Sequence, residues 1–91
     1  MQVTILGKRW ELTFARMGAR FEGHCDHPER AGKQIRIDRR LKGQRKLEIV
    51  LHECLHAALW SIDEQYVDDT ARDLARVLWR LGYRDDPDKE T

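Results

Sequence analysis

The sequence predicts one small α+β domain, built from a small antiparallel sheet of three to four strands with two packed helices. Three observations lead to this prediction. The chain has 91 residues, the size of one domain. Apolar residues alternate with a period of two up to residue 38, and after Gly43 they recur with a period of 3.6. We expect the domain to span 1–84 and a polar C-terminal tail, expected to fray, to span 85–91.

Four short strands are expected in the first half of the chain. Gly7-Lys8 is a turn signal between the first two, so these should form a hairpin. In the second strand, alternation places Trp10, Leu12 and Phe14 on one face. The expected strands are 3–6, 9–14, 19–23 and 34–38.

Two helices are expected in the second half. The first spans 45–60 and carries apolar residues around most of its girth, which predicts a largely buried helix. Capping residues at 61–63 interrupt the pattern, and a second helix then runs from 64 or 65 to about 81, where Gly82 is a good stop. Its expected core stripe is Val67, Ala71, Leu74, Ala75, Leu78 and Leu81.

The composition excludes several classes of protein. No apolar run approaches the roughly 20 residues of a membrane span, and the N-terminus lacks a signal-peptide pattern, so we expect a cytoplasmic protein with no membrane partner. Two cysteines, Cys25 and Cys54, do not make a disulfide framework. The oligomeric state is left open by the sequence.

The net charge of +1 hides an uneven distribution along the chain. Residues 1–46 carry 12 Lys and Arg against 5 Asp and Glu, whereas residues 47–91 carry 5 against 11. The basic excess is concentrated in 33–46, where only Asp38 opposes Lys33, Arg36, Arg39, Arg40, Lys42, Arg45 and Lys46. This stretch is either a solvated face or a patch for a nucleic acid or an acidic partner.

His52-Glu53-Cys54-Leu55-His56 is a His-Glu-x-x-His motif within the first predicted helix. Residues four apart share one helix face, so the two imidazoles can bind one zinc ion. Glu53 would then lie beside the metal without binding it and act as the general base. Burying these three polar side chains in an apolar helix without partners would cost several kcal/mol, and a metal removes that cost.

A catalytic zinc takes three protein ligands and leaves one position for water. In an antiparallel helix hairpin, residues 68–70 come level with the gap between His52 and His56, and Asp68 borders the apolar stripe. Asp68 is therefore the expected third ligand. Glu64 is the alternative, with Asp68 then orienting a ligand histidine. In a third interpretation, Asp68 is only an acid favoured by the helix dipole.

Residues 51–57 together with the Asp68-x-x-Ala71-x-x-Leu74-Ala75 pattern resemble the minimal zincin metallopeptidases. The similar groups are the ImmA/IrrE-like and SprT-like domains and the minigluzincins, including short phage and bacterial proteins. The resemblance implies a zinc-dependent peptidase that cleaves peptide or protein substrates, with His52 and His56 as metal ligands, Glu53 as general base and Asp68 as the acidic ligand. Under this hypothesis, substrate backbone adds antiparallel to the strand at 34–38.

Two alternative functions accompany this interpretation. The first is a nucleic-acid-associated or protein-interaction module with a structural or vestigial zinc site. The second is a small interaction protein without metal. His24, Cys25 and His27 invite a second metal site, although adjacent side chains diverge. Cys25 alone would be either a plain loop or core cysteine or a thiolate that blocks the open position on the metal.

Overall fold

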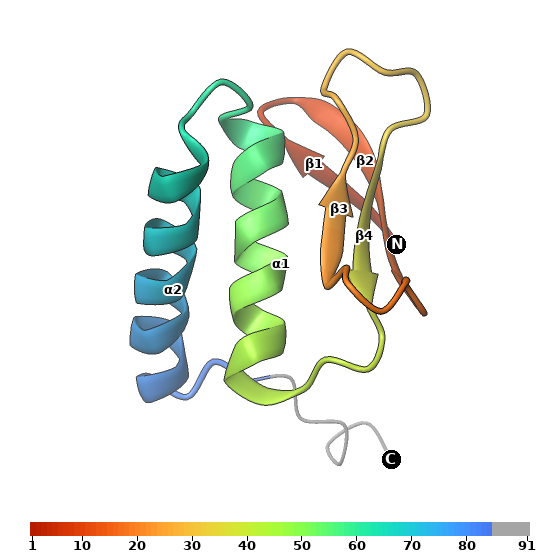
Figure 1. The fold of residues 1–91 in the computed structure, drawn as a ribbon. Helices are drawn as coiled ribbons and strands as arrows, with labels where there is room; N and C mark the ends of the chain where they lie inside the picture. Colours follow the sequence, from red (N-terminus) through yellow and green to blue (C-terminus); the bar gives the residue numbers. More distant parts are fainter. Residues whose placement is uncertain (85–91) are drawn as a thin grey trace.

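The computed structural model describes residues 1–84, so the expected tail at 85–91 lies outside the described residues. The described chain is an α+β fold with the expected order of four strands followed by two helices (Figure 1). The elements are β1 Gln2–Ile5, β2 Lys8–Ala15, β3 Gly23–Cys25, β4 Gln34–Asp38, α1 Gly43–Ala58 and α2 Glu64–Arg80. None of the described helices has the length and apolar content needed to cross a membrane.

The four strands form one sheet in the order β1-β2-β4-β3. β1 and β2 form the expected hairpin, and its two turn residues, Leu6 and Gly7, both have positive φ, as the favoured two-residue hairpin turn requires. β4 lies between β2 and β3, parallel to β2 and antiparallel to β3. The sheet is therefore mixed rather than wholly antiparallel, because the chain passes through β3 before it returns to β2.

The third strand lies later in the sequence than expected. It covers Gly23–Cys25 instead of 19–23, and the side chain of Phe21 is 61% exposed. The backbone N–H of Phe21 donates to the carbonyl of Gly18, so this segment is a turn. Alternation around one aromatic residue was too short a pattern to locate a three-residue strand.

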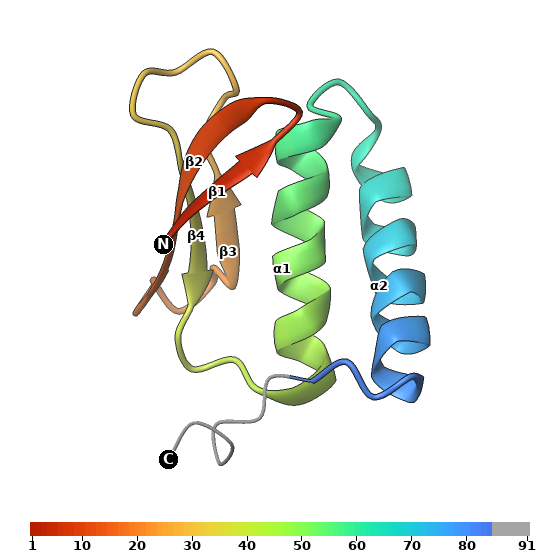
Figure 2. The same cartoon turned by 180° about the vertical axis from the view of Figure 1, so that it is seen from behind.

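α1 is the central layer of the molecule, between the sheet and α2 (Figures 1 and 2). Within residues 1–84, α2 packs on α1 and makes no contact with the strands. One helix covers only a narrow stripe, so Val67, Ala71 and Ala75 are buried as expected, whereas Leu74 and Leu81 are exposed. The prediction that these two leucines belong to the core was wrong.

The core lies between α1 and the sheet. Trp10 and Leu12 are buried there with Ile35 and Ile37 of β4, which confirms the face predicted for β2. Phe14, on the same face, is nevertheless 43% exposed. α1 is less enclosed than expected, because only Ile49, Glu53 and Ala57 are fully buried along it.

The ends of α2 follow the expected signals. The Asp63 side chain accepts a hydrogen bond from the backbone N–H of Gln65, so Asp63 is the N-cap. Beyond the C-terminal end, Gly82 adopts a φ of 92°, and its N–H and that of Tyr83 donate to carbonyls of the last helical turn. The Asp63 cap fixes Glu64 as the first residue of α2, and Glu64 belongs to the candidate site.

Candidate metal centre

His52 and His56 project from α1 toward the start of α2. Because they are four residues apart, their rings lie on one face of the helix and meet edge to face, with centroids 4.7 Å apart and an interplanar angle of 72°. The two Nε2 atoms are 3.1 Å apart, and both side chains are largely buried. The sequence placed these imidazoles on one face, and the structure also brings their Nε2 atoms to one point.

Glu64, the first residue of α2, closes this arrangement. Its Oε1 lies 3.1 Å from Nε2 of His52 and its Oε2 lies 2.9 Å from Nε2 of His56. Potential ligand atoms of His52, His56 and Glu64 all lie within 4.8 Å of one another. In the part of the chain that the structure describes, no other group of three His, Cys, Asp or Glu side chains meets this condition.

Asp68 contacts the opposite side of the His52 ring. Its Oδ1 lies 3.1 Å from Nδ1 of His52. A neutral His52 that donates its Nδ1–H to this carboxylate keeps an unprotonated Nε2, which is the form that binds metals. The structure thus places Asp68 where a positioning residue acts, and Glu64 where a third ligand acts.

The position of α2 along α1 explains why Glu64, and not the expected Asp68, lies near both Nε2 atoms. His56 lies against Glu64 and His52 lies against Asp68, so both contacts are centred on residue 60 of the hairpin. The sequence estimate placed that centre slightly later, which moved Asp68 toward the gap between the histidines. Glutamate also has one more methylene than aspartate, and this added length lets Glu64 reach both Nε2 atoms.

The donor set fits a zinc ion. Zinc binds imidazole nitrogen and carboxylate oxygen at roughly 2.0–2.2 Å, so tetrahedral ligand atoms lie about 3.2–3.6 Å apart. The nitrogen and oxygen atoms of His52, His56 and Glu64 lie 2.9–3.1 Å apart, slightly closer than that. Burial lowers the pKa of His56, which favours the neutral, metal-binding imidazole.

Glu53 lies beside this group on the sheet side of α1. Its side chain is buried, and the residue is only 7% exposed. Burial, followed by the nearby Glu64 carboxylate, raises the pKa of Glu53 to about 7 in the metal-free chain. A carboxyl with a pKa near neutrality can both take up and release a proton at physiological pH.

Gly23 of β3 makes room for the Glu53 side chain. A Cβ at this position would lie 2.8 Å from Oε2 of Glu53 and 2.9 Å from Cγ2 of Ile49. Sequence reasoning missed this role, although a glycine inside a strand is a general sign that another group approaches closely.

The histidines, Glu53 and Glu64 line one open cleft with a volume of about 600 Å³. The other lining residues are Phe21, Gly23, His24, Cys25, Trp60 and Ile62. Trp60 is 41% exposed at this cleft, with its ring centroid 6.3 Å from that of His56. The cleft therefore has aromatic and apolar walls around a polar centre.

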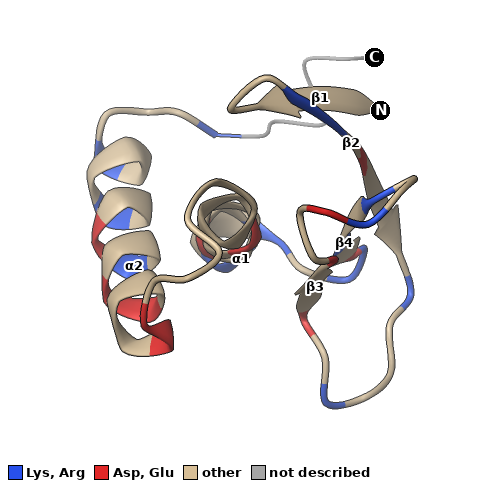
Figure 3. Cartoon of the chain, turned by 90° about the horizontal axis from the view of Figure 1, so that it is seen from above, with Lys and Arg blue, Asp and Glu red and all other residues tan. Residues whose placement is uncertain are grey.

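Acidic residues gather at the N-terminal end of α2 (Figure 3). Glu64 and Asp68 are the two that contact His52. Part of the acidic excess in the second half of the chain is thus concentrated where a dication would reside.

The other candidate residues do not form a second metal site. The His24 Nε2 atom lies 3.2 Å from a carboxylate oxygen of Asp26, and His27 Nδ1 accepts a hydrogen bond from the N–H of Glu29. The Cys25 thiol donates to the carbonyl of Asp26, and burial raises its pKa to about 12. A protonated thiol is a poor ligand, so Cys25 lines the cleft as a small apolar group.

Comparisons with protein families, with curated proteins and with solved structures found no match for this chain.

Proposed function

We propose that this protein is a zinc-dependent metallopeptidase of the minimal zincin type. The observation that carries the proposal is the convergence of His52, His56 and Glu64, with the buried carboxyl group of Glu53 in the same cleft. The charge of the site supports it as well. Two carboxylates around two imidazoles suit a dication, and the cleft is open enough to admit a chain segment.

In this proposal, His52, His56 and Glu64 hold the ion, and Asp68 orients the His52 ring through Nδ1. Bound there, zinc would polarise the scissile carbonyl and lower the pKa of a water molecule. Glu53 takes the proton from the attacking water and passes it to the leaving amine. Its confinement against Gly23 and Ile49 fixes the carboxyl group for this transfer.

The free edge of β3 is the proposed position of the substrate backbone. The strand at 34–38, suggested by the sequence, cannot serve because β4 lies between β2 and β3. The backbone N–H of Asp26 donates to the carbonyl of Gln34, and the carbonyl of Glu22 accepts from the N–H of Asp38, so both residues face β4. By the alternation of an antiparallel pair, the backbone groups of Gly23 and Cys25 point away from β4, toward a peptide added at that edge.

Metal analysis and one substitution test the catalytic proposal. Protein purified without added metal should contain close to one zinc per chain and should cleave an unstructured protein such as casein. Glu53→Gln should keep the zinc and reduce cleavage by about a thousandfold or more, because it removes the proton acceptor. Zinc-free protein, or equal cleavage by the variant, would contradict the proposal. Nucleic-acid binding by both forms without cleavage would instead favour the alternative module.

Two isosteric substitutions separate the roles of Glu64 and Asp68. Glu64→Gln should abolish zinc retention, because an amide oxygen is a much weaker ligand than a carboxylate. Asp68→Asn should weaken zinc binding by roughly 10- to 100-fold, as expected for a residue that acts through a ligand histidine. Competition with a fluorescent zinc chelator measures both affinities. A larger loss for Asp68→Asn than for Glu64→Gln would instead support Asp68 as the third ligand.

A further inference from the structure

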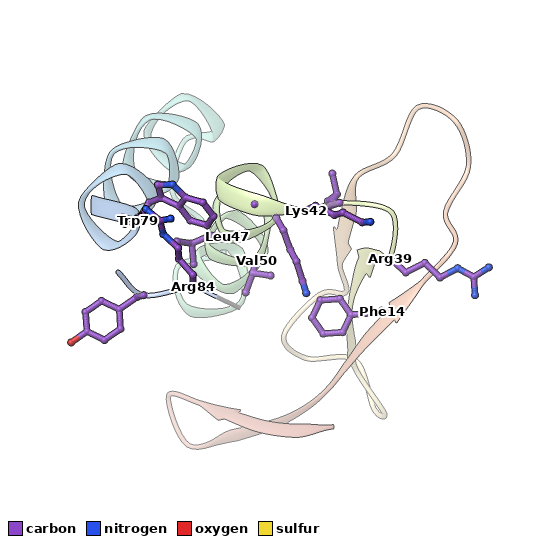
Figure 4. Close-up of a pocket in the computed structure, with 11 residues that line it drawn as sticks. Phe14, Arg39, Lys42, Leu47, Val50, Trp79 and Arg84 are labelled. Atoms are coloured by element: carbon purple, nitrogen blue, oxygen red, sulfur yellow. Dashed lines mark hydrogen bonds between the residues drawn. The ribbon is translucent and has the colours of Figure 1, made fainter. Parts of the chain in front are cut away.

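A second pocket lies at the other end of the helix pair, between the first turns of α1, the end of α2 and the C-terminal ends of β2 and β4 (Figure 4). It has a volume of about 510 Å³ and shares no lining residue with the cleft at the histidines. Its lining residues are Phe14, Arg39, Leu41, Lys42, Gly43, Lys46, Leu47, Val50, Trp79, Tyr83 and Arg84.

The floor of this pocket is apolar. Leu47 and Val50 of α1 lie between Trp79 of α2 on one side and Phe14 of β2 on the other (Figure 4). Phe14 lies on the core face of β2 but near the end of the strand, where it stays 43% exposed. A recess of this size with an aliphatic and aromatic floor accommodates one or two bulky apolar side chains.

The rim of the pocket is basic. Among residues 1–84, four cations line it, namely Arg39, Lys42, Lys46 and Arg84, and no carboxylate does. Arg84 lies over the Trp79 ring at 4.1 Å and donates to the Trp79 carbonyl, and Lys46 lies 4.9 Å from the centroid of Phe14. Neither Arg39 nor Lys42 forms a salt bridge with another residue in 1–84.

The rest of the basic stretch at 33–46 does not contribute to this rim. Arg40 pairs with Asp38, Arg45 with Glu22 and Glu48, and Arg36 with Asp26. The cations of this stretch therefore do not gather on one surface. Those at the rim of the apolar recess are the ones that line this pocket.

We propose that this pocket binds an acidic peptide segment of a partner protein that carries a bulky apolar side chain. The recess takes the apolar side chain, and Arg39 and Lys42 at the rim face the flanking carboxylates. A single-stranded nucleic acid fits less well, because bases bind by stacking on aromatic faces. One face of Trp79 and one of Phe14 are already covered by Arg84 and Lys46.

This binding is separate from the proposed catalysis. Lys46 precedes His52 by six residues along α1, about 9 Å along the helix axis, and the two pockets have no common residue. The segment therefore binds whether or not the histidines hold a metal.

Fluorescence anisotropy with a labelled ten-residue peptide tests the proposal. The peptide has a central Leu-Leu pair with acidic residues on both sides, and the protein is the full chain. We expect a dissociation constant in the micromolar range that weakens with added salt. Replacing Leu-Leu by Ser-Ser should weaken binding about tenfold, and a peptide with Lys in place of the acids should not bind.

Charge-reversed proteins locate the binding site. Arg39→Glu with Lys42→Glu should weaken binding about tenfold or more. Arg9→Glu with Arg20→Glu changes the net charge equally at exposed positions outside the pocket, and should weaken it less than threefold. Circular dichroism checks that both variants are folded. Equal losses in the two variants, or no binding at millimolar peptide, would overturn the proposal.

Two further outcomes would assign the pocket to another occupant. Tighter binding of a single-stranded oligonucleotide of matched charge, lost in the Arg39 and Lys42 variant, would assign it to nucleic acid. The chain's own residues 85–91 carry four acids and one lysine. If replacing Asp85, Asp86 and Asp88 by Asn tightened peptide binding more than tenfold, the pocket would belong to this tail, and the proposal would be wrong.

Discussion

Gly23 of the sheet lies against the Glu53 side chain of the candidate site. The Glu53 carboxyl group and the Ile49 methyl group occupy the space that a β-carbon on Gly23 would need. Packing holds Glu53 in this position, because Ile49 and Ala57, one turn before and after it on α1, are also buried where the helix packs on the sheet. Glycine at this position of β3 is therefore a condition for burial of the Glu53 carboxyl group.

Gly23→Ala should lower the free energy of unfolding by about 1–3 kcal/mol, because the added methyl overpacks this contact. It should also reduce cleavage more than zinc binding, since it displaces Glu53 and not the histidines. Gly18→Ala is the matched control, because its β-carbon would meet only Phe21 at an ordinary 3.7 Å. Urea unfolding and zinc titration measure both effects, and equal stabilities of the two variants would contradict this account.

Asp38 is a second residue whose charge matters to the fold. Its buried carboxylate accepts hydrogen bonds from the Arg40 guanidinium and backbone N–H, and Arg40 also donates to the Met17 carbonyl. The bonds from Arg40 hold the pKa of Asp38 far below its usual range. The ion pair thus ties the end of β4 to the segment that follows β2.

The stability from Asp38 should depend on pH with a defined sign. Because the folded-state pKa is lowered, the contribution is complete above the unfolded-state value of about 4 and is lost progressively below it. Asp38→Asn should therefore melt several degrees lower than the parent at pH 7, and the difference should shrink below about pH 4. Asp73→Asn, which breaks an exposed pair with Arg76, should leave the melting temperature unchanged both at pH 7 and below pH 4. A constant difference across this range would refute the role of the charge.

At the scale of elements, the closeness of α1 and α2 decides whether the metal site can form. Ala71 and Ala75 are fully buried at the contact between the helices, and no larger residue of α2 lies between them on that stripe. Short side chains let the helix axes approach, and this approach brings Glu64 to the two histidines. The alanine stripe is thus part of the candidate site although it touches no ligand atom.

Ala71→Leu should lower the free energy of unfolding by about 1–3 kcal/mol or more, because a leucine must push the helices apart. Zinc affinity should fall with it, since Glu64 lies on α2 and the histidines on α1. Thr70→Leu is the control, because this neighbouring position is exposed. Thermal melting and zinc titration measure the two effects. Unchanged zinc affinity in a folded Ala71→Leu protein would show that the ligand contact does not depend on helix spacing.

For the whole molecule, metal binding should be coupled to folding. The ligands come from both helices, and α2 contacts no strand within the described chain, so an ion would join the outer layer to the rest. Free zinc at 100 times its dissociation constant stabilises a protein by about 2.7 kcal/mol. For a chain of this size, that raises the melting temperature by roughly 10–20 °C.

Differential scanning calorimetry with zinc or with a chelator checks this prediction. Glu64→Gln should lose most of the zinc-dependent rise, whereas Asp69→Asn, on the exposed side of α2, should keep it. A melting temperature that does not respond to zinc or to a chelator would favour an interaction protein without metal.

The sequence by itself determined the class of the fold, the order of its elements and the helix that carries His52, Glu53 and His56. These follow from local periodicity and from turn and capping signals, which depend on residues within a few positions of one another. The same locality explains why Trp10, Leu12, Asp63 and Gly82 occupy the predicted positions.

Only the tertiary structure decided the features that depend on how distant segments meet. The parallel pairing of β4 with β2, the exposure of Phe14 and Leu74, and the space that Gly23 leaves for Glu53 arise from contacts between segments. Which carboxylate lies near both Nε2 atoms is of the same kind, because a shift of one or two residues between the two packed helices would change the contacts of Glu64 and Asp68 with the histidines. Such a level is set by packing and by the connection at 59–63, and no periodic pattern in the sequence records it.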